Sequence, residues 1–580
     1  MASLEEKRHT LAHLLAAAVL ERYPNAKTTI GPAVDNGFYY DFDFSGGEAP
    51  KEADLASLEE VMRELLSSWN EMTGTEVSEK DARDRFNANE YKREIIDGIV
   101  AANETITLYT AGNFTDLCRG GHAENPNHEV KADSFTLDRI AGAYWRGDET
   151  KPMLTRIYGL AFDTKAELEA YKEQQEEAKK RDHKKLGREL DLFVFSELVG
   201  PGLPLFTPKG TMVRDLLDEF VWELRKPYGY EKVEIPHITK KDLYETSGHW
   251  DKFKDELFRI TTREGHEFAM KPMNCPHHTQ IYARKQWSYR ELPQRYSNTT
   301  TCYRDEQSGE LSGLSRVRAF SQDDAHVFCR VADVKTEFLK VWDIIHAFYP
   351  TFGFDLQVRF STHDPEHPEN YLGDPSVWNT AEAVLAEVLE EKQIEAIPGL
   401  GEAAFYGPKL DFIAKDSLGR SWQVATIQLD MNQPERFDLT CINEEGKKER
   451  IVMIHAAIMG SIERFLSILI EHTAGNLPVW LSPVQVRVLP VSDKQAEYAA
   501  SVATSLQTSG VRADADMSNE SLGKKIRAAK TEKIPYLLVV GDTEIADSTV
   551  TVEMRSGEKM GALSLQDFAD RITKEIQERA

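Results

Sequence analysis

The sequence predicts a multidomain protein in which α+β and α/β parts are joined along one chain. With 580 residues, the chain is long enough for about three or four domains of ordinary size. Residues 165–186 are nearly all charged and favour a helix, which is typical of a solvated linker helix. From residue 481 onward, strand-like and helix-like segments alternate, as in a small βαβ-type domain. We therefore expect domains over residues 1–164, 187–480 and 481–580.

Composition restricts the class of protein further. The formal net charge of -26 argues against a basic coat for non-specific nucleic-acid binding. The five cysteines are odd in number and widely spread, which fits a reducing compartment better than a disulfide framework. The N-terminus lacks the basic and apolar regions of a signal peptide, and no run of about eighteen apolar residues occurs. We expect a cytoplasmic protein with neither a membrane nor DNA as a partner.

The first domain contains two small groups of chemically active residues. Residues 11–20 favour a helix, and His9 and His13 are four residues apart, so both imidazoles project from one helical face. Cys118 and His122 follow later with the same spacing. Four such side chains could form a metal or catalytic pocket. Two buried histidines and an unrelated loop cysteine would explain the same pattern.

The segment between these groups also has a predicted structure. Residues 31–44 have the pattern of a turn followed by a strand that enters an aromatic core. Lys92 lies in a helical stretch.

The second domain opens with an amphipathic helix. Its apolar residues recur at helical spacing and are Val213, Leu216, Leu217, Phe220, Val221 and Leu224. The strand that follows is broken by Pro236, and a proline confines a strand to a sheet edge or to a place where another chain packs. This strand is therefore a candidate subunit interface.

Residues 295–330 predict a hairpin with strands over 296–304 and 317–328 and a polar loop over 307–315. The hairpin carries unusually many charged side chains, namely Arg304, Glu306, Arg316, Arg318, Asp323 and Asp324, with Gln322 and His326 among them. Planar guanidinium groups on both arms would suit a polyphosphate. The alternative is an edge hairpin with solvated charges.

A second set of metal-type residues is spread over the second domain. Cys275, His326 and His455 have the composition of an open zinc site with three protein ligands. Their separations of 51 and 129 residues carry no local signature, so three unrelated buried residues remain the alternative.

The last domain differs from the rest of the chain in charge. Residues 481–580 contain 13 Lys and Arg against 15 Asp and Glu, a net charge of -2 in a chain at -26. This near-neutral balance is compatible with a module that faces nucleic acid, although an ordinary small α/β domain would have the same charge.

Taken together, several motifs resemble one family. They are HTLAH with DLCRGGH, KPMNCP, YRDE through QDDAHVF, FYGPKLDF, WQVATIQLD and GSIERF, in this order. From His9 onward the chain closely resembles bacterial threonyl-tRNA synthetases, which are class II aminoacyl-tRNA synthetases. The resemblance implies an editing domain over 1–164, an antiparallel class II catalytic domain over 187–480 and an anticodon-binding domain over 481–580. It also implies a homodimer that uses ATP, L-threonine and tRNA(Thr).

The resemblance assigns an ATP site to the predicted hairpin. Arg304 would hold the α-phosphate, Glu306 the adenine amino group and Arg316 the γ-phosphate. Phe320 and Arg464 would enclose the adenine ring, and each residue type suits its role. Gln423 and Lys409 are implied as further catalytic residues, and Mg²⁺ would bind with ATP. Threonyl-adenylate would form first, and its acyl group would then pass to the terminal adenosine of the tRNA.

Zinc is also implied by the resemblance, on Cys275, His326 and His455. The metal would bind the amino group and β-hydroxyl of threonine. The residues implied around the substrate are Gln322, Asp324, Tyr406, Lys409, Gln428 and Ser461. A site built for a hydroxyl rejects valine by about 10⁴ to 10⁵, whereas serine lacks only a methyl group, worth roughly 1 to 3 kcal/mol.

A second site is therefore required against serine. The resemblance places hydrolysis of seryl-tRNA at His9, His13, Lys92, Cys118 and His122. These residues would position substrate and water without holding a metal.

The sequence departs from the family pattern at several positions, which are Tyr303, Ser312, Ala319, His277, Ala425, Ala456 and Glu553. The family commonly opens with a small ubiquitin-like domain, which we expect this chain to lack. Two alternatives follow from these departures and from the residue types. One is a synthetase-like paralogue that binds or deacylates tRNA without ligating, and the other is a zinc hydrolase built on the first histidine and cysteine group.

Overall fold

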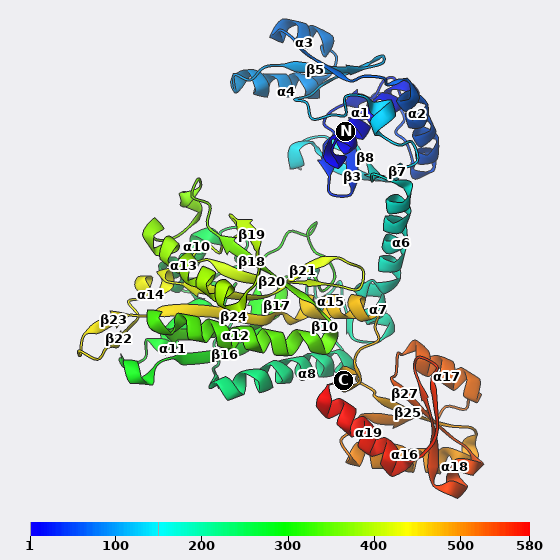
Figure 1. Cartoon of the computed structure of the whole chain (residues 1–580), viewed down its shortest axis with the longest axis vertical. Coiled ribbons are helices and arrows are strands. Elements are labelled where there is room, and N and C mark those ends of the chain that lie inside the picture. Colours follow the sequence, from blue (N-terminus) through cyan, green and yellow to red (C-terminus); the bar gives the residue numbers. More distant parts are fainter. Residues whose placement is uncertain (1, 149, 580) are drawn as a thin grey trace. The chain divides into compact units, whose positions relative to one another are not determined.

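The computed structural model describes residues 2–148 and 150–579, and it divides into two compact units, Met1–Glu176 and Glu177–Ala580 (Figure 1). The division falls inside helix α6 (Lys165–Arg181). The single linker helix predicted over 165–186 is wrong, because α6 is followed by a separate helix α7 (His183–Glu189). Asp182 separates the two helices and accepts the backbone N–H of Lys184 at 2.7 Å, which is the geometry of an N-cap.

The first unit is built on helix α1 (Leu4–Arg22), which packs against strand β3 (Gly37–Asp43) and helix α2 (Leu55–Ser68). The capping box of Ser3 and Glu6 begins α1, and the predicted helix over 11–20 is confirmed within it. Strand β3 lies in an antiparallel sheet with β1 (Lys27–Thr28), β2 (Ala33–Val34), β7 (Phe135–Tyr144) and β8 (Met153–Ala161). Its aromatic residues Phe38, Tyr40 and Phe42 are buried, as predicted for the segment over 31–44.

A smaller antiparallel sheet completes this unit. It comprises β4 (Thr73–Glu76), β5 (Thr107–Ala111) and β6 (Phe114–Leu117), accompanied by α3 (Glu79–Arg85), α4 (Glu90–Ala101) and the short α5 (Pro126–Glu129). Lys92 lies in α4 as predicted, and it is buried.

The second unit contains an eight-stranded sheet in the order β11-β16-β17-β24-β21-β20-β18-β19. Neighbouring strands are antiparallel except at the two edges, where β11 pairs with β16 and β19 with β18 in parallel. The strands are β11 (Glu231–Lys232), β16 (Gln294–Tyr303), β17 (Ala319–Cys329), β18 (Leu356–Thr362), β19 (Ile397–Leu400), β20 (Lys409–Lys415), β21 (Ser421–Asp430) and β24 (Val452–Ser461). Strands β16 and β17 form the predicted hairpin.

Helices cover this sheet. The predicted amphipathic helix is α8 (Pro208–Arg225), which packs on α12 (Val334–Phe348), and α12 in turn packs on β21 and β24. Helix α15 (Ile462–Thr473) begins directly where β24 ends and crosses β17. Strand β11 lies at the sheet edge, as expected for the segment before Pro236, which itself lies outside both β11 and β12 (Ile238–Lys240).

Smaller elements surround this core. They are β9 (Phe193–Val194), β10 (Leu205–Phe206), α9 (Lys241–Ser247), α10 (His249–Lys252), β13 (Arg259–Thr261), β14 (Glu267–Met270), α11 (Cys275–Tyr282), β15 (Trp287–Ser288), α13 (Pro375–Lys392), α14 (Asn432–Arg436), β22 (Thr440–Ile442) and β23 (Lys448–Arg450).

The C-terminal part forms a five-stranded mixed sheet in the order β26-β25-β27-β28-β29. Its first three strands are parallel and the last two are antiparallel, which confirms the predicted α/β domain. The strands are β25 (Val486–Pro490), β26 (Ala513–Ala515), β27 (Tyr536–Val540), β28 (Thr549–Met554) and β29 (Lys559–Ser564), and the helices are α16 (Ala496–Thr508), α17 (Leu522–Thr531), α18 (Asp542–Asp547) and α19 (Leu565–Glu578).

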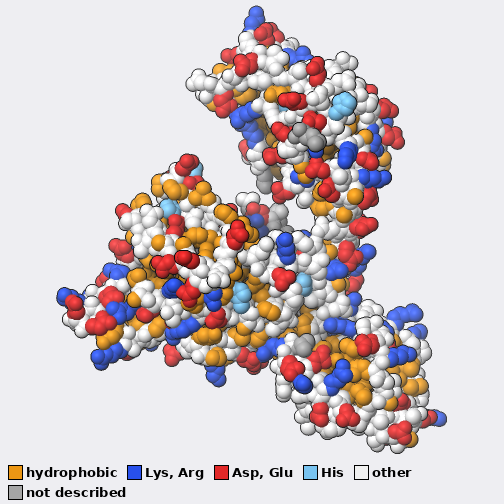
Figure 2. All heavy atoms as spheres, viewed as in Figure 1, with side chains coloured by type: hydrophobic (Ala, Val, Ile, Leu, Met, Phe, Trp, Pro, Cys, Tyr) orange, Lys and Arg blue, Asp and Glu red, His pale blue; other side chains and the backbone are white. Residues whose placement is uncertain are grey.

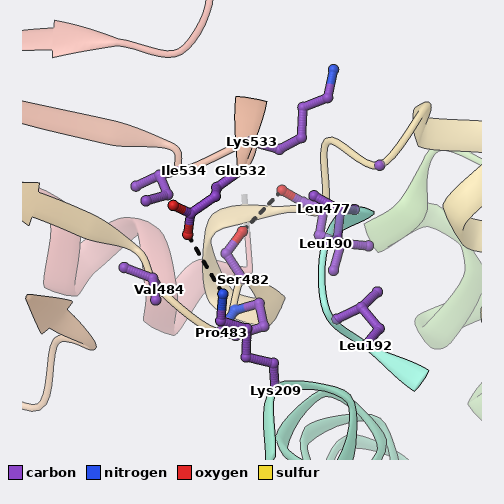
Figure 3. A pocket seen from close by; sticks show the side chains of 11 residues that line it. Leu190, Leu192, Lys209, Leu477, Ser482, Pro483, Val484, Glu532, Lys533 and Ile534 are labelled. Atoms are coloured by element: carbon purple, nitrogen blue, oxygen red, sulfur yellow. Dashed lines mark hydrogen bonds and ion pairs between the residues drawn. The ribbon is translucent and has the colours of Figure 1, made fainter. Parts of the chain in front are cut away.

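A small cavity lies where this domain meets the eight-stranded core. Figure 3 shows Leu190, Leu192 and Leu477 on one side and Val484 and Ile534 on the other. Its volume of about 30 Å³ has room for about one water molecule, so it is a packing gap and not a ligand site.

Acidic and basic side chains are interspersed on the visible face of the molecule (Figure 2). Among the described residues, none of the helices combines the length and the apolar composition needed to cross a membrane.

Candidate active sites

A cavity of about 390 Å³ lies at the loop end of the β16–β17 hairpin, where α15 begins. It is lined by Arg304, Glu306, Ser315, Arg316, Val317, Phe320, Trp422, Ser461 and Arg464. The structure therefore brings together all the residues predicted to hold ATP except Gln423, which lies outside this lining. The alternative of an edge hairpin with merely solvated charges is wrong, because β16 and β17 are interior strands of the sheet.

Arg304 offers a positive charge at this cavity. Its guanidinium carbon lies 5.2 Å from the ring centre of Phe253 and 5.3 Å from that of Phe320. Its Nε is buried and has no hydrogen-bond partner among the described residues. A guanidinium group held between two rings with an unused donor is well prepared for a phosphate oxygen.

Arg316 and Glu306, predicted to hold opposite ends of ATP, are paired with each other here. Nε of Arg316 donates to Oε2 of Glu306 at 2.8 Å, and its Nη2 donates to Glu310 at 3.0 Å. Arg318 fixes the same turn by donating from Nε and Nη2 to the backbone oxygen of Glu306. Arg316 would have to leave these carboxylates to reach a phosphate.

The start of α15 forms the opposite wall. Ser461 caps the helix by accepting the backbone N–H of Arg464 at 3.2 Å and donates its own hydroxyl to Glu463. Trp422 also lines the cavity, with its ring centre 6.0 Å from the guanidinium carbon of Arg464. Sequence reasoning missed Trp422, although it directly precedes the predicted Gln423.

Cys275, His326 and His455 meet deep in the same unit. Strand register places His326 on β17 beside His455 on β24, and Cys275 is the first residue of α11. The ligand atoms of the three residues lie within 4.8 Å of one another, and all three side chains are buried. The alternative of three unrelated residues is therefore wrong, and the cluster has the geometry of a metal-binding group.

The surroundings of this cluster orient its ligands. His326 Nε2 faces His455 Nδ1 at 3.0 Å, while the other ring nitrogen of His455 lies 3.0 Å from Oδ2 of Asp430. Nδ1 of His326 contacts His278 at 2.8 Å. A carboxylate behind a histidine is the usual support of a metal ligand. Sequence reasoning missed these supporting residues, because Asp430 and His278 are remote from their partners along the chain.

Protonation in the cluster also fits a metal. Burial raises the pKa of the Cys275 thiol well above its usual value, and burial lowers the pKa of His326 well below its usual value. A neutral imidazole is ready to bind a cation, and a bound metal would replace the thiol proton. Nε2 of His249 and Nε2 of Gln433 both lie 3.5 Å from the sulfur.

Predicted threonine-binding residues border the metal cluster. Asp324 accepts a hydrogen bond from Asn274 at 3.1 Å, and burial raises the pKa of Asp324 to about 6. Tyr406 stacks on the ring of His455 with centres 4.7 Å apart, and its hydroxyl donates to Gln428 at 2.5 Å. These contacts join two predicted substrate residues to the predicted metal ligand His455.

Lys409 and Gln423 are tied together by Asp411, which sequence reasoning missed. Lys409 Nζ lies 2.8 Å from Oδ2 of Asp411, and Gln423 donates to its Oδ1 at 2.8 Å. Arg359 donates to Gln423 at 2.8 Å and to Asp411 at 3.3 Å. Gln322 lies on β17 opposite Ser461.

The histidines and the cysteine predicted to form the editing site lie close together in the first unit. Sγ of Cys118 lies 3.4 Å from Nε2 of His9 and 3.4 Å from Nε2 of His122. The rings of His9 and His13 both face His122, at 4.3 and 4.9 Å between centres. The alternative of an unrelated loop cysteine is therefore wrong.

Asp116, which sequence reasoning missed, connects these residues to Lys92. Lys92 Nζ lies 2.5 Å from Oδ1 of Asp116, and His13 Nδ1 lies 3.2 Å from Oδ2. Tyr40 donates its hydroxyl to the same carboxylate at 2.5 Å. Asp116 stands two residues before Cys118, and that proximity in sequence was the available signal.

Charge in this group is arranged around the sulfur. Burial alone would raise the pKa of Cys118, but hydrogen bonds from His122 and His9 and the nearby charge of His13 lower it to about 3. Burial opposes protonation of His13, yet Asp116 and Cys118 raise the pKa of His13 to about 9. Cys118 is therefore a thiolate and His13 an imidazolium. The thiolate can accept a hydrogen bond from an amino group, and the pair can orient water.

Two departures from the family pattern compensate each other locally. Tyr303 and Ala319 face each other across β16 and β17, so the larger residue is opposite the smaller one. The Tyr303 hydroxyl lies 3.0 Å from Nδ1 of His237. The ring of His277 is buried, and neither of its nitrogens has a partner among the described residues; nothing in the structure explains that substitution.

Of the remaining departures, Ser312 is exposed, and the other three lie in packed or paired positions. Ala425 and Ala456 are buried within the eight-stranded sheet. Glu553 on β28 forms an ion pair with Lys530 at 2.6 Å.

Comparisons with known proteins agree with this geometry. Residues 258–473 match the tRNA synthetase class II core domain (G, H, P, S and T), and residues 485–575 match an anticodon binding domain. The chain is 48% identical over 575 residues to the threonine-tRNA ligase of Porphyromonas gingivalis, covering 98% of this chain and 87% of that protein. It is 46% identical over 587 residues to the threonine-tRNA ligase of Gloeobacter violaceus, covering 99% and 93%.

Solved structures give the same result. A crystal structure titled as the RNA binding domain of threonyl-tRNA synthetase from Cryptosporidium parvum aligns with a TM-score of 0.65 at 37% identity, covering 68% of this chain and 98% of that chain. A putative threonyl-tRNA synthetase from Aeropyrum pernix aligns with a TM-score of 0.61 at 29% identity, covering 69% and 96%. On the identity and coverage of its relatives, the chain belongs to the threonine-tRNA ligases, enzymes of the class II aminoacyl-tRNA synthetases.

Proposed function

We propose that this enzyme joins L-threonine to tRNA(Thr) through threonyl-adenylate and hydrolyses seryl-tRNA(Thr) at a second site. The observation that carries the first part is the adjacency of the metal cluster to the predicted threonine-binding residues, next to a cavity that holds the arginines expected for ATP. Domains over 1–164, 187–480 and 481–580 would carry editing, catalysis and anticodon binding, in line with the two matched spans.

Zinc is the metal that the cluster fits best. One buried thiol and two imidazoles are the soft and borderline ligands that Zn²⁺ prefers, and three protein ligands leave a place for substrate. When bound by Cys275, His326 and His455, zinc would supply a Lewis acid for the amino group and β-hydroxyl of threonine. Asp324, held by Asn274, would accept a hydrogen bond from the substrate. Valine cannot supply the hydroxyl and would be rejected.

Activation would then depend on positioning and charge. Arg304 would neutralise the α-phosphate while the threonine carboxylate attacks it, with Phe320 and Arg464 on the adenine and Mg²⁺ on the ATP phosphates. Arg316 would move from Glu306 to the γ-phosphate, which frees Glu306 for the adenine amino group. Lys409 and Gln423, fixed by Asp411, would complete the site.

Editing would take place at the thiolate group of the first unit. Cys118, His9 and His122 would hold the seryl group and a water molecule, and His13 would supply positive charge. Lys92 would keep Asp116 ionised beneath them.

The assembly is proposed to be a cytoplasmic homodimer. Strand β11 has two residues and lies at the edge of the large sheet, next to Pro236, where another chain can pack. Sedimentation velocity of the full chain would give the mass of a dimer.

The decisive test is ATP–pyrophosphate exchange with threonine, serine and valine, with and without a zinc chelator. We expect exchange with threonine, weaker exchange with serine, none with valine, and loss on chelation. Absence of exchange with all three amino acids would favour a paralogue that does not ligate. Hydrolysis of seryl-tRNA(Thr) is measured on the same protein.

A further inference from the structure

The linker ends in a histidine that is built into the catalytic unit. His183, the first residue of α7, is 3% exposed. Its Nδ1 lies 2.6 Å from Oε1 of Glu471, and its Nε2 lies 3.0 Å from the backbone nitrogen of Leu314. A backbone N–H only donates, so Nε2 accepts, and Nδ1 must carry the ring proton that is donated to Glu471. With both nitrogens engaged, His183 is a bridge and not a metal ligand.

The bridge reaches the loop that joins β16 to β17. Leu314 is fully buried and lies two residues before Arg316, and its neighbour Ser315 lines the ATP cavity. Gly313 has a φ of +51°, and a Cβ at this position would come within 2.2 Å of Nε2 of His183. The loop is therefore packed directly onto the imidazole ring.

Helix α15 holds this loop and lines the cavity from one face. Arg464, Ser467 and Glu471 are spaced i, i+3 and i+7, so they project from the same side of the helix. Arg464 lines the cavity, Oγ of Ser467 lies 2.9 Å from Oγ of Ser315, and Glu471 holds His183.

Glu471 also reaches the opposite wall. Its second oxygen accepts Nη2 of Arg420 at 2.6 Å. Both Arg420 and Trp422 donate to Oδ2 of Asp416, at 2.7 and 2.9 Å, and Trp422 lines the cavity. Burial would raise the pKa of Glu471, but hydrogen bonds from His183 and Arg420 lower it, so one ionised carboxylate supports two walls.

We propose that His183 is a positioning residue for ATP, which holds the loop over 307–315 at the cavity by accepting the N–H of Leu314. The linker thereby supplies part of the ATP site, although it lines none of the cavity. This inference rests on the proposed roles of Arg304 and Arg316 in binding ATP.

Two substitutions separate the loop contact from mere packing. In His183→Gln the side-chain oxygen stands near the place of Nε2 and can accept the N–H of Leu314. In His183→Asn the shorter amide can still donate to Glu471 but cannot reach the loop. We expect His183→Asn to raise KM for ATP about tenfold, because a buried N–H without a partner costs that much, and His183→Gln to restore most of the loss. KM for threonine stays unchanged in both.

A second pair leaves the histidine intact. Gly313→Ala drives a methyl group against Nε2 of His183 and forces the loop away, so KM for ATP rises as in His183→Asn. Gly309→Ala is the control for a methyl group added to the same loop, because a Cβ there meets no atom within 4 Å. Neither glycine lies inside a helix or strand, so both variants are expected to fold.

Pyrophosphate exchange with full-length protein is measured for the wild type and all four variants, together with thermal unfolding. Absence of exchange in the wild type would count against the proposed function. A working wild type in which the Asn and Gln variants have the same KM for ATP, or in which Gly313→Ala behaves as Gly309→Ala, would overturn the role of His183. Equal melting temperatures of the Asn and Gln variants, with different KM for ATP, would support it.

Discussion

Lys92 and Asp116 form an ion pair with 2.5 Å between Nζ and Oδ1, and both side chains are only 2% exposed. Removing one partner of such a pair leaves a charge buried without compensation, which costs about 3 kcal/mol. We predict that Lys92→Met lowers hydrolysis of seryl-tRNA(Thr) at least about 100-fold and leaves threonine-dependent pyrophosphate exchange unchanged. Adding Asp116→Asn should recover thermal stability but not hydrolysis. If exchange fell together with hydrolysis, the two activities would not be confined to separate units.

The thiolate of Cys118 predicts an unusual pH dependence. Its pKa is lowered to about 3, so the thiolate fraction should stay constant from pH 5 to pH 8. Alkylation by iodoacetamide, followed by mass spectrometry, should proceed at a nearly constant rate over this range, whereas an ordinary thiol would react about tenfold faster for each pH unit. His13→Ala removes the positive charge beside the sulfur and should restore a rising profile. A rising profile in the wild type would contradict the charged state.

The same pKa values determine how the contributions of Cys118 and His13 to the stability of the fold change with pH. The folded state lowers the pKa of Cys118 from 9.0 to about 3, so its stabilising contribution is complete above pH 9 and decreases as the pH falls toward 3. The folded state raises the pKa of His13 from 6.5 to about 9, so its contribution is complete below pH 6.5 and is lost as the pH rises through 9.

The contacts of Asp430 predict that it strengthens metal binding by the Cys275, His326 and His455 cluster. Its Oδ2 faces Nε2 of His455 at 3.0 Å, and its Oδ1 accepts the backbone N–H groups of Asn432 and Gln433. Asp430→Asn keeps an oxygen for these backbone groups but weakens the support of the histidine. We expect zinc affinity, measured by chelator competition, to fall about 10- to 100-fold. Cys118→Ser is the control and should keep its zinc; zinc lost from that variant instead would place the metal in the first unit.

Arg225 and Asp323 predict a stability change that depends on pH. They form a buried ion pair at 3.2 Å, and burial raises the pKa of Asp323 to about 7. A carboxyl group whose folded-state pKa is raised stabilises the fold most at low pH, and that contribution is lost as the pH rises from about 4 through 7.

Arg225→Met should therefore lower the melting temperature, and more strongly at pH 8 than at pH 5, because Asp323 takes up a proton at the lower pH. Adding Asp323→Asn removes the buried charge and should reduce the difference between the two pH values. Calorimetry of the full chain measures both. An equal deficit at both pH values would show that Arg225 acts through packing alone.

Local patterns in the sequence were sufficient for most elements. The spacing of Val213, Leu217 and Phe220 identified α8. The Thr, Ser and Tyr content of residues 296–304 and the extended pattern of residues 317–328 identified β16 and β17, because these signals are local. The break at Asp182 was missed, since the neighbouring charged residues favour a helix on both sides of it.

The sequence also identified some residues of the sites and missed others. The metal set and the ATP set were assigned from motifs that resemble a known family. The structure brings the metal set together and, except for Gln423, the ATP set as well. Asp116, Asp430 and Asp411 were missed, because each acts by supporting another side chain. Such a contact depends on strand register and helix packing, which no single segment of sequence determines.

The way α7 packs on the catalytic unit determines where this chain can be recombined. Because the compact second unit begins at Glu177, a chimera that exchanges the first unit should be joined before that residue, within α6. A junction placed after Leu186 would replace His183 by the residue of the other protein while Gly313 stays native. Gly313 packs closely on the His183 ring, so a side chain of another shape would not fit there. We expect chimeras with such a junction to bind ATP poorly, even when both parts fold.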